Sequence, residues 1–368
     1  MKGVCGMPEK IPVGILGATG MVGQQYIRLL RQHPWFKIEF LAASPKSAGK
    51  NYGDAVAGRW HAEEDIPETV RDMIVEDAAD ADRAASRCRM VFSAVEMEKS
   101  AVAELEETYA GKGMAVVSNN SAHRWTADVP MIIPEINADH LSCIPIQRRK
   151  RGWERGLIVV KSNCSIQSYL TPLHALINAG FPVDRMFIAT LQAVSGAGYP
   201  GPSSFDMIDN IIPYINGEEE KSEKEPLKIL GSITDGEIVN SSLPAISAHC
   251  NRVPVLHGHT ACASLAFAED KPDLREIVRI WENFRSDPQE LELPSAPLQP
   301  IVYRYESNRP QPRFDRDSGR AMGVSVGRLR ACSLLDIRFV GLHHNTVRGA
   351  AGGCILTAEL LKARDYLN

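Results

Sequence analysis

Short β-rich runs alternate with helix-like segments between residues 11 and 161, and no other feature constrains the fold of this chain as strongly. This alternation is typical of a parallel, doubly wound sheet with helices on both faces. We therefore expect a Rossmann-like α/β N-terminal half. The expected strands span 11–16, 38–43, 90–95, 115–118 and 157–161, and the expected helices span 21–31 and 100–109, the second capped by Gly111.

The pattern changes after residue 163, where longer β runs follow one another with few helices between them. Such a sequence predicts an α+β domain built on a mostly antiparallel or mixed sheet. A helix-like stretch at 346–363 is expected to return to the first half. We therefore expect one domain at 1–163, completed by 345–368, and a second at 164–344. The strands expected in the second domain span 186–194, 253–257, 261–268, 301–305 and 323–340.

Two further segments carry no core pattern. Residues 286–300 are rich in proline and acidic residues, which favours a solvated loop or linker. Residues 147–155 form a basic cluster that is able to contact phosphate or an acidic partner. An exposed loop between two strands is the favoured interpretation of this basic cluster.

Length and composition favour a two-domain protein with small-molecule partners. The 368 residues are 44% hydrophobic, which is enough for two cores of ordinary size. With 41 basic and 45 acidic residues the net charge is −4, so no basic excess attracts nucleic acid or an anionic membrane.

The chain start and the cysteines favour a reduced, cytoplasmic protein. The first residues lack an apolar stretch of signal-peptide length, and no run of about 18 apolar residues occurs. The eight cysteines form no C-x-x-C pair, so we expect reduced thiols, mostly in the core, and neither a disulfide framework nor a metal site.

A glycine pattern, Gly17-x-x-Gly20-x-x-Gly23, follows the first expected strand and opens the first expected helix. Glycines permit a tight turn and close backbone approach, while the helix N-terminus points at a pyrophosphate. The spacing differs from G-x-G-x-x-G, and a turn that only packs a helix onto a sheet would show the same glycines. The position between strand and helix favours a dinucleotide site.

The choice of cofactor is expected to depend on the end of the second strand, where an NAD site usually offers an acidic residue to the ribose. Here Ser44, Lys46 and Ser47 follow that strand instead. Hydroxyl and ammonium groups suit a 2′-phosphate, so NADP is preferred, although an ordinary polar turn would have the same composition.

Cys164 lies where an apolar strand-like run gives way to a helical pattern. A thiol at a helix N-terminus feels the positive end of the backbone dipole, which favours the thiolate that attacks carbonyls. Cys164 is therefore a candidate nucleophile. Together with a dinucleotide site, it suggests an aldehyde dehydrogenase that works through a thioester.

Arg252, His257 and His259 form a compact group farther along the chain. The planar fork of arginine suits a substrate carboxylate, and histidine titrates near neutral pH as a general acid/base should. The residues alone do not choose between the two histidines. A structural role for either histidine would be the better interpretation if Cys164 were absent.

Taken together, these residues resemble the aspartate-semialdehyde dehydrogenase family over nearly the whole chain. The Arg-Val-Pro-Val run before Gly-His is similar to the archaeal and fungal branch, whereas Ser165-Ile166-Gln167 departs from the smaller residues common there. The matching stretches are 17–23, 43–50, 162–164, 192–198, 218–221, 252–259 and 345–349.

The resemblance implies a role for each matching residue. Cys164 would be the nucleophile and His259 the acid/base. In the substrate site, Arg252 would bind the substrate carboxylate and Gln192 would orient the acyl intermediate. Glu218 would bind the substrate amino group, and Lys221 would bind phosphate. Asn163 would lie beside the nicotinamide and the substrate. The implied cofactor-binding residues are Gly17, Thr19, Gly20, Met21, Val22, Gly23, Ser44, Lys46, Ser47, Ser195, Gly196 and Asn345.

The implied reaction interconverts L-aspartate semialdehyde plus phosphate with aspartyl phosphate, using NADP, in lysine, threonine and methionine biosynthesis. The implied assembly is a homodimer or homotetramer formed through the second domain. Two other kinds of enzyme share the loop, cysteine and histidine, namely N-acetyl-glutamyl-phosphate reductase and malonyl-CoA reductase. A nucleotide-binding scaffold without catalysis is a third alternative, disfavoured because Cys164, Arg252 and His259 are all present.

Overall fold

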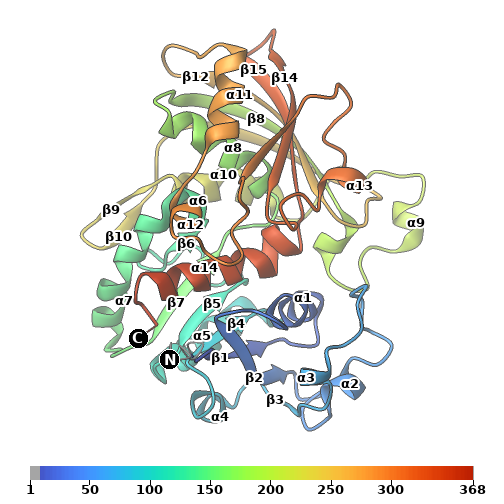
Figure 1. Ribbon diagram of the computed structural model, residues 1–368, viewed down its shortest axis with the longest axis vertical. Helices are drawn as coiled ribbons and strands as arrows, with labels where there is room; N and C mark the ends of the chain where they lie inside the picture. Colours follow the sequence, from blue (N-terminus) through green and yellow to red (C-terminus); the bar gives the residue numbers. More distant parts are fainter. Residues whose placement is uncertain (1–8, 368) are drawn as a thin grey trace, which may run out of the picture.

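The computed structural model describes residues 9–367 and contains two large sheets, the lower and upper parts of Figure 1. The first sheet has seven strands in the order β3-β2-β1-β4-β5-β7-β6, and every pairing in it is parallel. This order confirms the Rossmann-like, doubly wound sheet. Its strands are β1 (Ile11–Leu16), β2 (Phe36–Ala43), β3 (Val75–Asp77), β4 (Met90–Ser93), β5 (Ala115–Ser118), β6 (Met131–Ile132) and β7 (Leu157–Lys161).

The five predicted strands of this sheet are all present, three of them with the predicted bounds. Strand β2 begins earlier because Phe36 is already buried in the core, and β4 ends at Ser93. The predicted cap at Gly111 is wrong, since Gly111 is the last residue of its helix. The left-handed turn falls at Gly113, whose φ is +83°.

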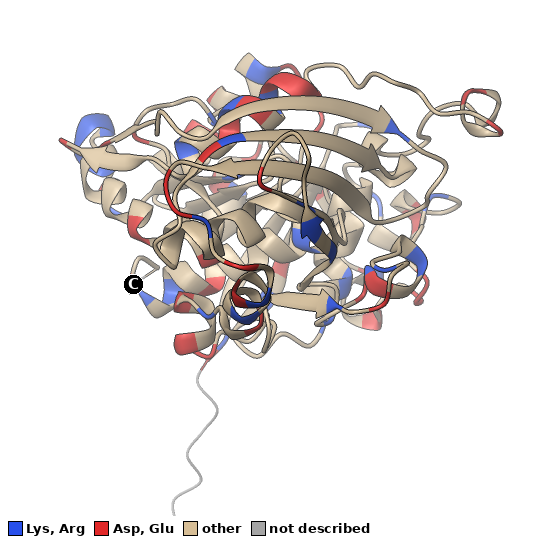
Figure 2. Cartoon of the chain, turned by 90° about the horizontal axis from the view of Figure 1, so that it is seen from above, with Lys and Arg blue, Asp and Glu red and all other residues tan. Residues whose placement is uncertain are grey.

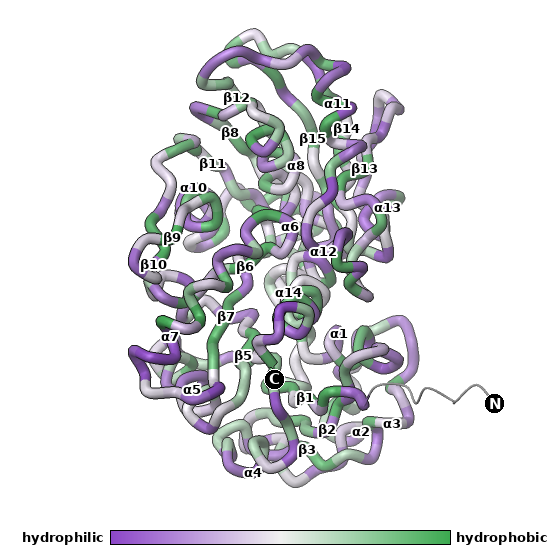
Figure 3. The backbone as a smooth tube through the Cα atoms, turned by 60° about the vertical axis from the view of Figure 1, so that its left-hand side comes forward, coloured by the Kyte–Doolittle hydropathy of each residue, from purple (hydrophilic) through white to green (hydrophobic). Residues whose placement is uncertain are grey.

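Helices flank the first sheet. The basic segment at 147–155 was expected in a loop, but its first half forms the last turns of α7. Figure 3 shows that end of α7 as hydrophilic beside the hydrophobic strand β7. Basic side chains at a helix C-terminus complement the backbone dipole, which explains the position. The helices are α1 (Met21–Leu30), α2 (Tyr52–Ala55), α3 (Glu68–Arg71), α4 (Ala81–Ala85), α5 (Lys99–Gly111), α6 (Pro134–Asn137), α7 (Ile144–Arg151) and α14 (Gly352–Ala363).

The second sheet has six strands in the order β11-β8-β12-β15-β14-β13. The outer pairs β11/β8 and β13/β14 are parallel and the inner pairs are antiparallel, so the sheet is mixed, as predicted. Its strands are β8 (Val183–Gln192), β11 (Ala245–Arg252), β12 (His259–Phe267), β13 (Ile301–Arg304), β14 (Val324–Ala331) and β15 (Ile337–His343), and a separate hairpin is formed by β9 (Ser232–Thr234) and β10 (Glu237–Val239).

One face of the six-stranded sheet packs against α8 and α11. Trp281 of α11 is fully buried and donates a hydrogen bond from Nε1 to the Pro172 carbonyl of α8, at 2.9 Å. Figure 2 shows that charged residues lie mostly on helices and loops, while the long strands carry few. The helices of this half are α8 (Gln167–Asn178), α9 (Ser204–Met207), α10 (Glu218–Ile229), α11 (Leu274–Asn283), α12 (Asp287–Glu290) and α13 (Pro312–Asp315).

Four predictions for the second half need correction. Residues 253–257 form a loop because Pro254 and the left-handed Gly258 (φ +105°) interrupt the β run. The run at 323–340 is two strands, β14 and β15, joined by a turn. The segment 286–300 contains α12, which has a capping box at Ser286, and the helix at 346–363 begins with a π-helical turn, Val347–Ala351, before α14.

The two sheets are joined through β7, α8 and α14. Strand β7 ends at Lys161, and the chain passes through Cys164 into α8, which packs under the second sheet. Helix α14 returns from the second sheet and packs against α1, β5 and β7 (Figure 1). The buried Glu359 of α14 contacts His33 at 2.7 Å.

Among residues 9–367, no helix is long and apolar enough to cross a membrane. The first residues, on which the expectation about a signal peptide rests, lie outside the described part of the chain.

The contact between α8 and β15 leaves no room for a side chain at Gly341. A Cβ atom there would lie 1.9 Å from the Ser168 carbonyl oxygen of α8. We predict that Gly341→Ala lowers the free energy of unfolding by about 2–3 kcal/mol, because α8 must move off the sheet. Urea unfolding measures this change.

The matched control is Gly111→Ala, where the nearest atom to an added Cβ is 3.7 Å away. This substitution should leave stability unchanged or raise it by about 0.5–1 kcal/mol, since alanine favours the helix. Equal stability of both variants would contradict the close packing of α8 on β15.

Candidate active site

The predicted catalytic residues come from strand ends that meet at one edge of the second sheet. Gln192 and Arg252 are the last residues of the parallel strands β8 and β11 and are directly paired. His259 is the first residue of the antiparallel strand β12, so it lies at the same edge. Cys164 reaches this edge from the first sheet, three residues before α8.

Cys164 and His259 are in contact, with 3.4 Å between Sγ and Nε2. The other ring nitrogen of His259, Nδ1, accepts a hydrogen bond from the Ala193 backbone N–H at 3.0 Å. A nitrogen that accepts carries no proton, so the neutral ring carries its proton on Nε2. His259 therefore presents an N–H donor to the sulfur.

The surroundings shift the pKa of both groups in the direction that disfavours their charged forms. Burial, followed by the nearby Arg252, holds the pKa of His259 well below its usual value. Burial raises the pKa of the Cys164 thiol to about 11, and Glu218 raises it further while Lys161, Arg124 and Arg252 oppose the rise. The expectation of a thiol acidified by a helix N-terminus is wrong here, because desolvation is the largest influence on the thiol pKa and α8 begins only at Gln167, three residues beyond Cys164.

Arg252 lies beside this pair and is nearly buried. Its Nη1 donates to the Ala193 carbonyl at 2.7 Å, which leaves other guanidinium N–H groups free to meet a ligand. Gly196 packs against the same groups, since a Cβ there would lie 2.8 Å from Arg252 Nη1 and 3.0 Å from His259 Nε2. The absence of a side chain at Gly196 thus keeps the space beside the histidine open.

Glu218 is the centre of a second cluster, at the start of α10. Its carboxylate accepts from Asn163 Nδ2 at 2.8 and 3.0 Å, from Gln192 Nε2 at 3.2 Å and from Lys221 Nζ at 2.9 Å. Asn163 directly precedes Cys164, so this anion and its partners lie beside the thiol. The structure thus brings together all the predicted catalytic and substrate residues.

Ser195 and Asn345 form a third group, which contacts His257 and Gly258. Ser195 Oγ lies 2.9 Å from His257 Nδ1 and accepts from Asn345 Nδ2 at 2.9 Å. Asn345 Oδ1 in turn accepts the Gly258 N–H at 2.8 Å. His257 therefore contacts this group and not Cys164, which separates the two histidines that the sequence left open.

The glycine loop lies between β1 and α1, next to β4, where the order of the parallel strands reverses. Gly17 has a φ of +81°, and a Cβ at Gly23 would lie 2.2 Å from the Gly17 carbonyl oxygen. No side chain caps the first turn of α1, whose N-cap is Gly20. The N-terminus of α1 is therefore open to an anion, as a dinucleotide site requires, and this loop also carries Thr19, Met21 and Val22.

Ser44, Lys46 and Ser47 follow β2 in a turn that lies at the same sheet edge. The Gly17 N–H donates to the Ala42 carbonyl at 2.8 Å, which joins the glycine loop to the end of β2, just before this turn. Ser44 and Lys46 are exposed, whereas Ser47 is buried. Because all strands of the sheet are parallel, the glycine loop, this turn and Cys164 all follow carboxyl ends on one edge.

Several polar residues around Cys164 were not predicted from the sequence. Arg124 and Glu225 form a buried ion pair at 2.9 Å, and Glu225 accepts the Asn163 N–H. His343 packs edge-to-face on His259, with ring centroids 5.9 Å apart. No spacing or motif signals these contacts, since Arg124 and Glu225 are 101 residues apart.

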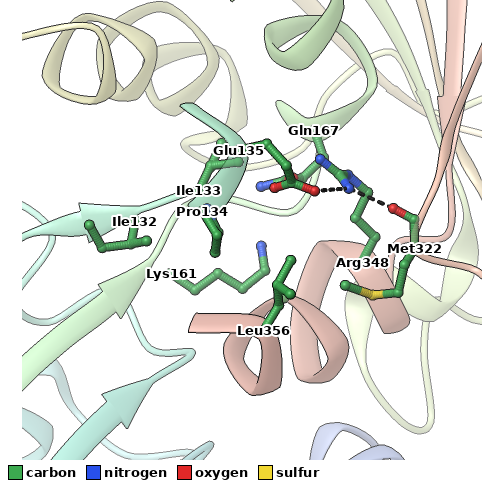
Figure 4. Close-up of a pocket in the computed structure, with 10 residues that line it drawn as sticks. Ile132, Ile133, Pro134, Glu135, Lys161, Gln167, Met322, Arg348 and Leu356 are labelled. Carbon is green, nitrogen blue, oxygen red and sulfur yellow. Dashed lines mark hydrogen bonds and ion pairs between the residues drawn. The ribbon is translucent and has the colours of Figure 1, made fainter. Parts of the chain in front are cut away.

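Arg348, in the matching stretch at 345–349, is buried, and the next residue, Gly349, packs against Cys164. Figure 4 shows its guanidinium between Glu135 and the Met322 carbonyl, at 2.7 and 2.5 Å, with Lys161 pointing toward them from below. The cavity between these groups is about 10 Å³, room for one water molecule. Arg348 therefore joins the segment before α14 to α6.

Comparisons with known proteins agree with this geometry. Residues 12–144 match the family model "Semialdehyde dehydrogenase, NAD binding domain", and residues 173–348 match "Semialdehyde dehydrogenase, dimerisation domain". Together these two matches cover most of the chain.

Two curated relatives, one fungal and one archaeal, are aspartate-semialdehyde dehydrogenases. The one from Schizosaccharomyces pombe is 44% identical, with 95% of this chain and 97% of the relative covered. The one from Methanothermobacter thermautotrophicus is 44% identical, with 95% and 99% covered.

A solved structure, aspartate semialdehyde dehydrogenase with NADP from Candida albicans, superimposes with a TM-score of 0.88. It is 41% identical, and the match covers 96% of this chain and 99% of the other. The chain therefore belongs to the aspartate-semialdehyde dehydrogenase family.

Proposed function

We propose that this chain catalyses the NADP-dependent interconversion of L-aspartate semialdehyde plus phosphate with L-aspartyl 4-phosphate, a step of lysine, threonine and methionine biosynthesis. The observation that carries the proposal is the contact between Cys164 Sγ and His259 Nε2 at the end of β7, on the sheet edge that also holds the glycine loop. The relatives of similar length and the neighbour with bound NADP support it.

The open N-terminus of α1 and the glycine loop fit the pyrophosphate of NADP, and Ser44, Lys46 and Ser47 fit its 2′-phosphate. Ser195, Gly196 and Asn345 would border the nicotinamide, since they lie beside the catalytic histidine. When bound, NADP supplies the two-electron acceptor of the oxidation.

In the proposed mechanism Cys164 loses its proton to water and its sulfur adds to the aldehyde carbon. The negative charge moves to the aldehyde oxygen, where the Nε2–H of His259 donates a hydrogen bond. Loss of hydride from the same carbon leaves a thioester on Cys164. Attack by phosphate then forms the acyl phosphate and releases the thiolate, so the nucleophile is regenerated.

The remaining residues fit the two ends of an amino-acid substrate. The free N–H groups of Arg252 suit the α-carboxylate, and the Glu218 carboxylate suits the α-ammonium. Lys221, held beside Glu218, offers a cation to phosphate, and Gln192 and Asn163 fix the Glu218 carboxylate. An N-acetylated substrate has no ammonium for Glu218, which disfavours N-acetyl-glutamyl-phosphate reductase.

The outer face of the six-stranded sheet is the proposed contact between two copies of the chain, as a homodimer or as part of a homotetramer. Phe187 on β8 is 42% exposed, and Cys262 on the neighbouring strand β12 is also exposed. The proposed domains are 1–163 completed by 345–368, which binds NADP, and 164–344, which carries catalysis and dimerisation. The proposed location is the cytoplasm.

The reaction is tested by the absorbance of NADPH at about 340 nm, with L-aspartate semialdehyde, NADP and phosphate. We predict phosphate-dependent activity, and a loss of more than about 1000-fold in Cys164→Ser with NADP affinity unchanged, because only the nucleophile is removed. Activity with N-acetyl-glutamate semialdehyde alone, or an active Cys164→Ser protein, would contradict the proposal.

Arg252→Lys is predicted to raise the KM for the semialdehyde by roughly tenfold or more and to change kcat less. Lysine keeps the charge but lacks the fork that holds the Ala193 carbonyl and a carboxylate together. The control is Arg279→Lys, at an exposed arginine of α11. Steady-state kinetics that give equal KM values for both variants would exclude Arg252 as the carboxylate site.

Phe187→Glu is predicted to halve the mass of the protein measured by light scattering, because it buries a charge in the proposed interface. Leu298→Glu is the control, since Leu298 is 92% exposed in a loop outside the sheet. A mass unchanged by Phe187→Glu, with wild type a dimer or tetramer, would place the interface elsewhere.

A further inference from the structure

Helix α10 directs charged residues into the protein, toward the segment that carries Cys164. Glu218, Ser222 and Glu225 are spaced as one helical face and are all buried. Ser222 Oγ lies 3.3 Å from Ser165 Oγ, and its carbonyl accepts the Tyr169 hydroxyl at 2.9 Å. One face of α10 therefore contacts the chain on both sides of the nucleophile.

Glu225 has no exposed surface and its two oxygens have different partners. Oε2 accepts the backbone N–H of Asn163 at 2.5 Å, and Oε1 accepts from Nη1 of Arg124 at 2.9 Å. Arg124 also donates from Nε to the Lys161 carbonyl at 3.0 Å. The pair thus holds the main chain on both sides of Ser162.

This is the point at which the chain leaves the sheet. The ladder between β6 and β7 ends at Lys161, and residues 162–164 lie in neither a strand nor a helix. Buried backbone groups need partners, and here Arg124 and Glu225 supply them. The position of the Cys164 backbone therefore depends on this ion pair and not on the sheet.

The segment that carries Arg124 is itself fixed to α10. Lys228, one further turn along the same face, donates to the carbonyls of Arg124, Thr126 and Val129 at 2.7, 2.8 and 3.0 Å. Arg124 thus cannot move without breaking contacts to the helix that also holds Glu225. The two members of the ion pair are fixed relative to each other.

We propose that the Arg124–Glu225 ion pair is a positioning device for the nucleophile, which aims Cys164 at His259 by fixing the peptide groups before it. The proposal deepens the proposed function and rests on Cys164 as the nucleophile. Arg124 and Glu225 act through the backbone and do not touch substrate, so both are positioning residues.

Two further facts support a role beyond stability. A buried ion pair is often no more stabilising than apolar residues of similar volume, so stability alone does not require these charges. Arg124 also lies close enough to oppose the rise in the Cys164 thiol pKa, so its charge favours the reactive thiolate.

The test compares wild type with the double variant Arg124→Met/Glu225→Met, which leaves no unpaired charge. We expect a fold close to wild type in urea unfolding, with kcat lowered by about 100-fold and KM changed by less than about threefold, because the thiol is misplaced. The pH midpoint for iodoacetamide alkylation of Cys164 should move upward, since the charge of Arg124 is removed.

The control is Asp128→Leu/Arg151→Met, which removes another ion pair from the same half of the protein. None of the hydrogen bonds and ion pairs of Asp128 and Arg151 in the described part of the chain involves residues 161–164, so this variant should keep kcat and the alkylation midpoint of wild type. If the first double variant does not fold, Arg124→Lys and Glu225→Gln, which keep the volume, are measured in the same way.

A double variant with kcat within about threefold of wild type and an unchanged alkylation midpoint would overturn the proposal. An inactive Glu225→Gln protein whose activity returns in the double variant would also overturn the proposal. The loss of activity in Glu225→Gln would then come from the unpaired charge of Arg124. Alkylation requires no assumption about the substrate. If wild type does not oxidise L-aspartate semialdehyde, the alkylation midpoints still decide whether the pair acts on Cys164.

Discussion

The contact between Cys164 and His259 brings together residues from two different sheets. Cys164 follows β7 of the parallel sheet, and His259 opens β12 of the mixed sheet, yet Sγ and Nε2 are 3.4 Å apart. Helix α8 continues from Cys164 and packs against β12, β14 and β15, and α14 packs back on β5 and β7. The proposed chemistry therefore depends on how these two helices hold the sheets together.

The interior around this contact contains two buried carboxylates, and each has partners that limit the cost of its burial. Glu218 is held by an asparagine, a glutamine and a lysine, whereas Glu225 is held by an arginine and a backbone N–H. Desolvation nevertheless raises the pKa of the Cys164 thiol to about 11. Binding of a substrate ammonium at Glu218 would remove one of the charges that disfavour the thiolate.

Much of the fold could be predicted, because alternation and glycine spacing are local signals. The strands at 11–16, 115–118 and 157–161 and the mixed second sheet follow from such patterns. The loop at 253–257 was missed because its residues favour strands while Pro254 and Gly258 set the backbone. The desolvation of the Cys164 thiol and the pairing of Arg124 with Glu225 arise only from tertiary packing, so no local pattern reveals the raised thiol pKa or the ion pair.

The central claim is that an acyl group passes through Cys164, and trapping that group is the most direct test. The protein is mixed with L-aspartate semialdehyde and NADP without phosphate, quenched in acid and digested, and its peptides are weighed by mass spectrometry. The account predicts an aspartyl mass increment on the peptide containing Cys164, lost on addition of phosphate. NADPH formation with every cysteine unmodified would contradict it.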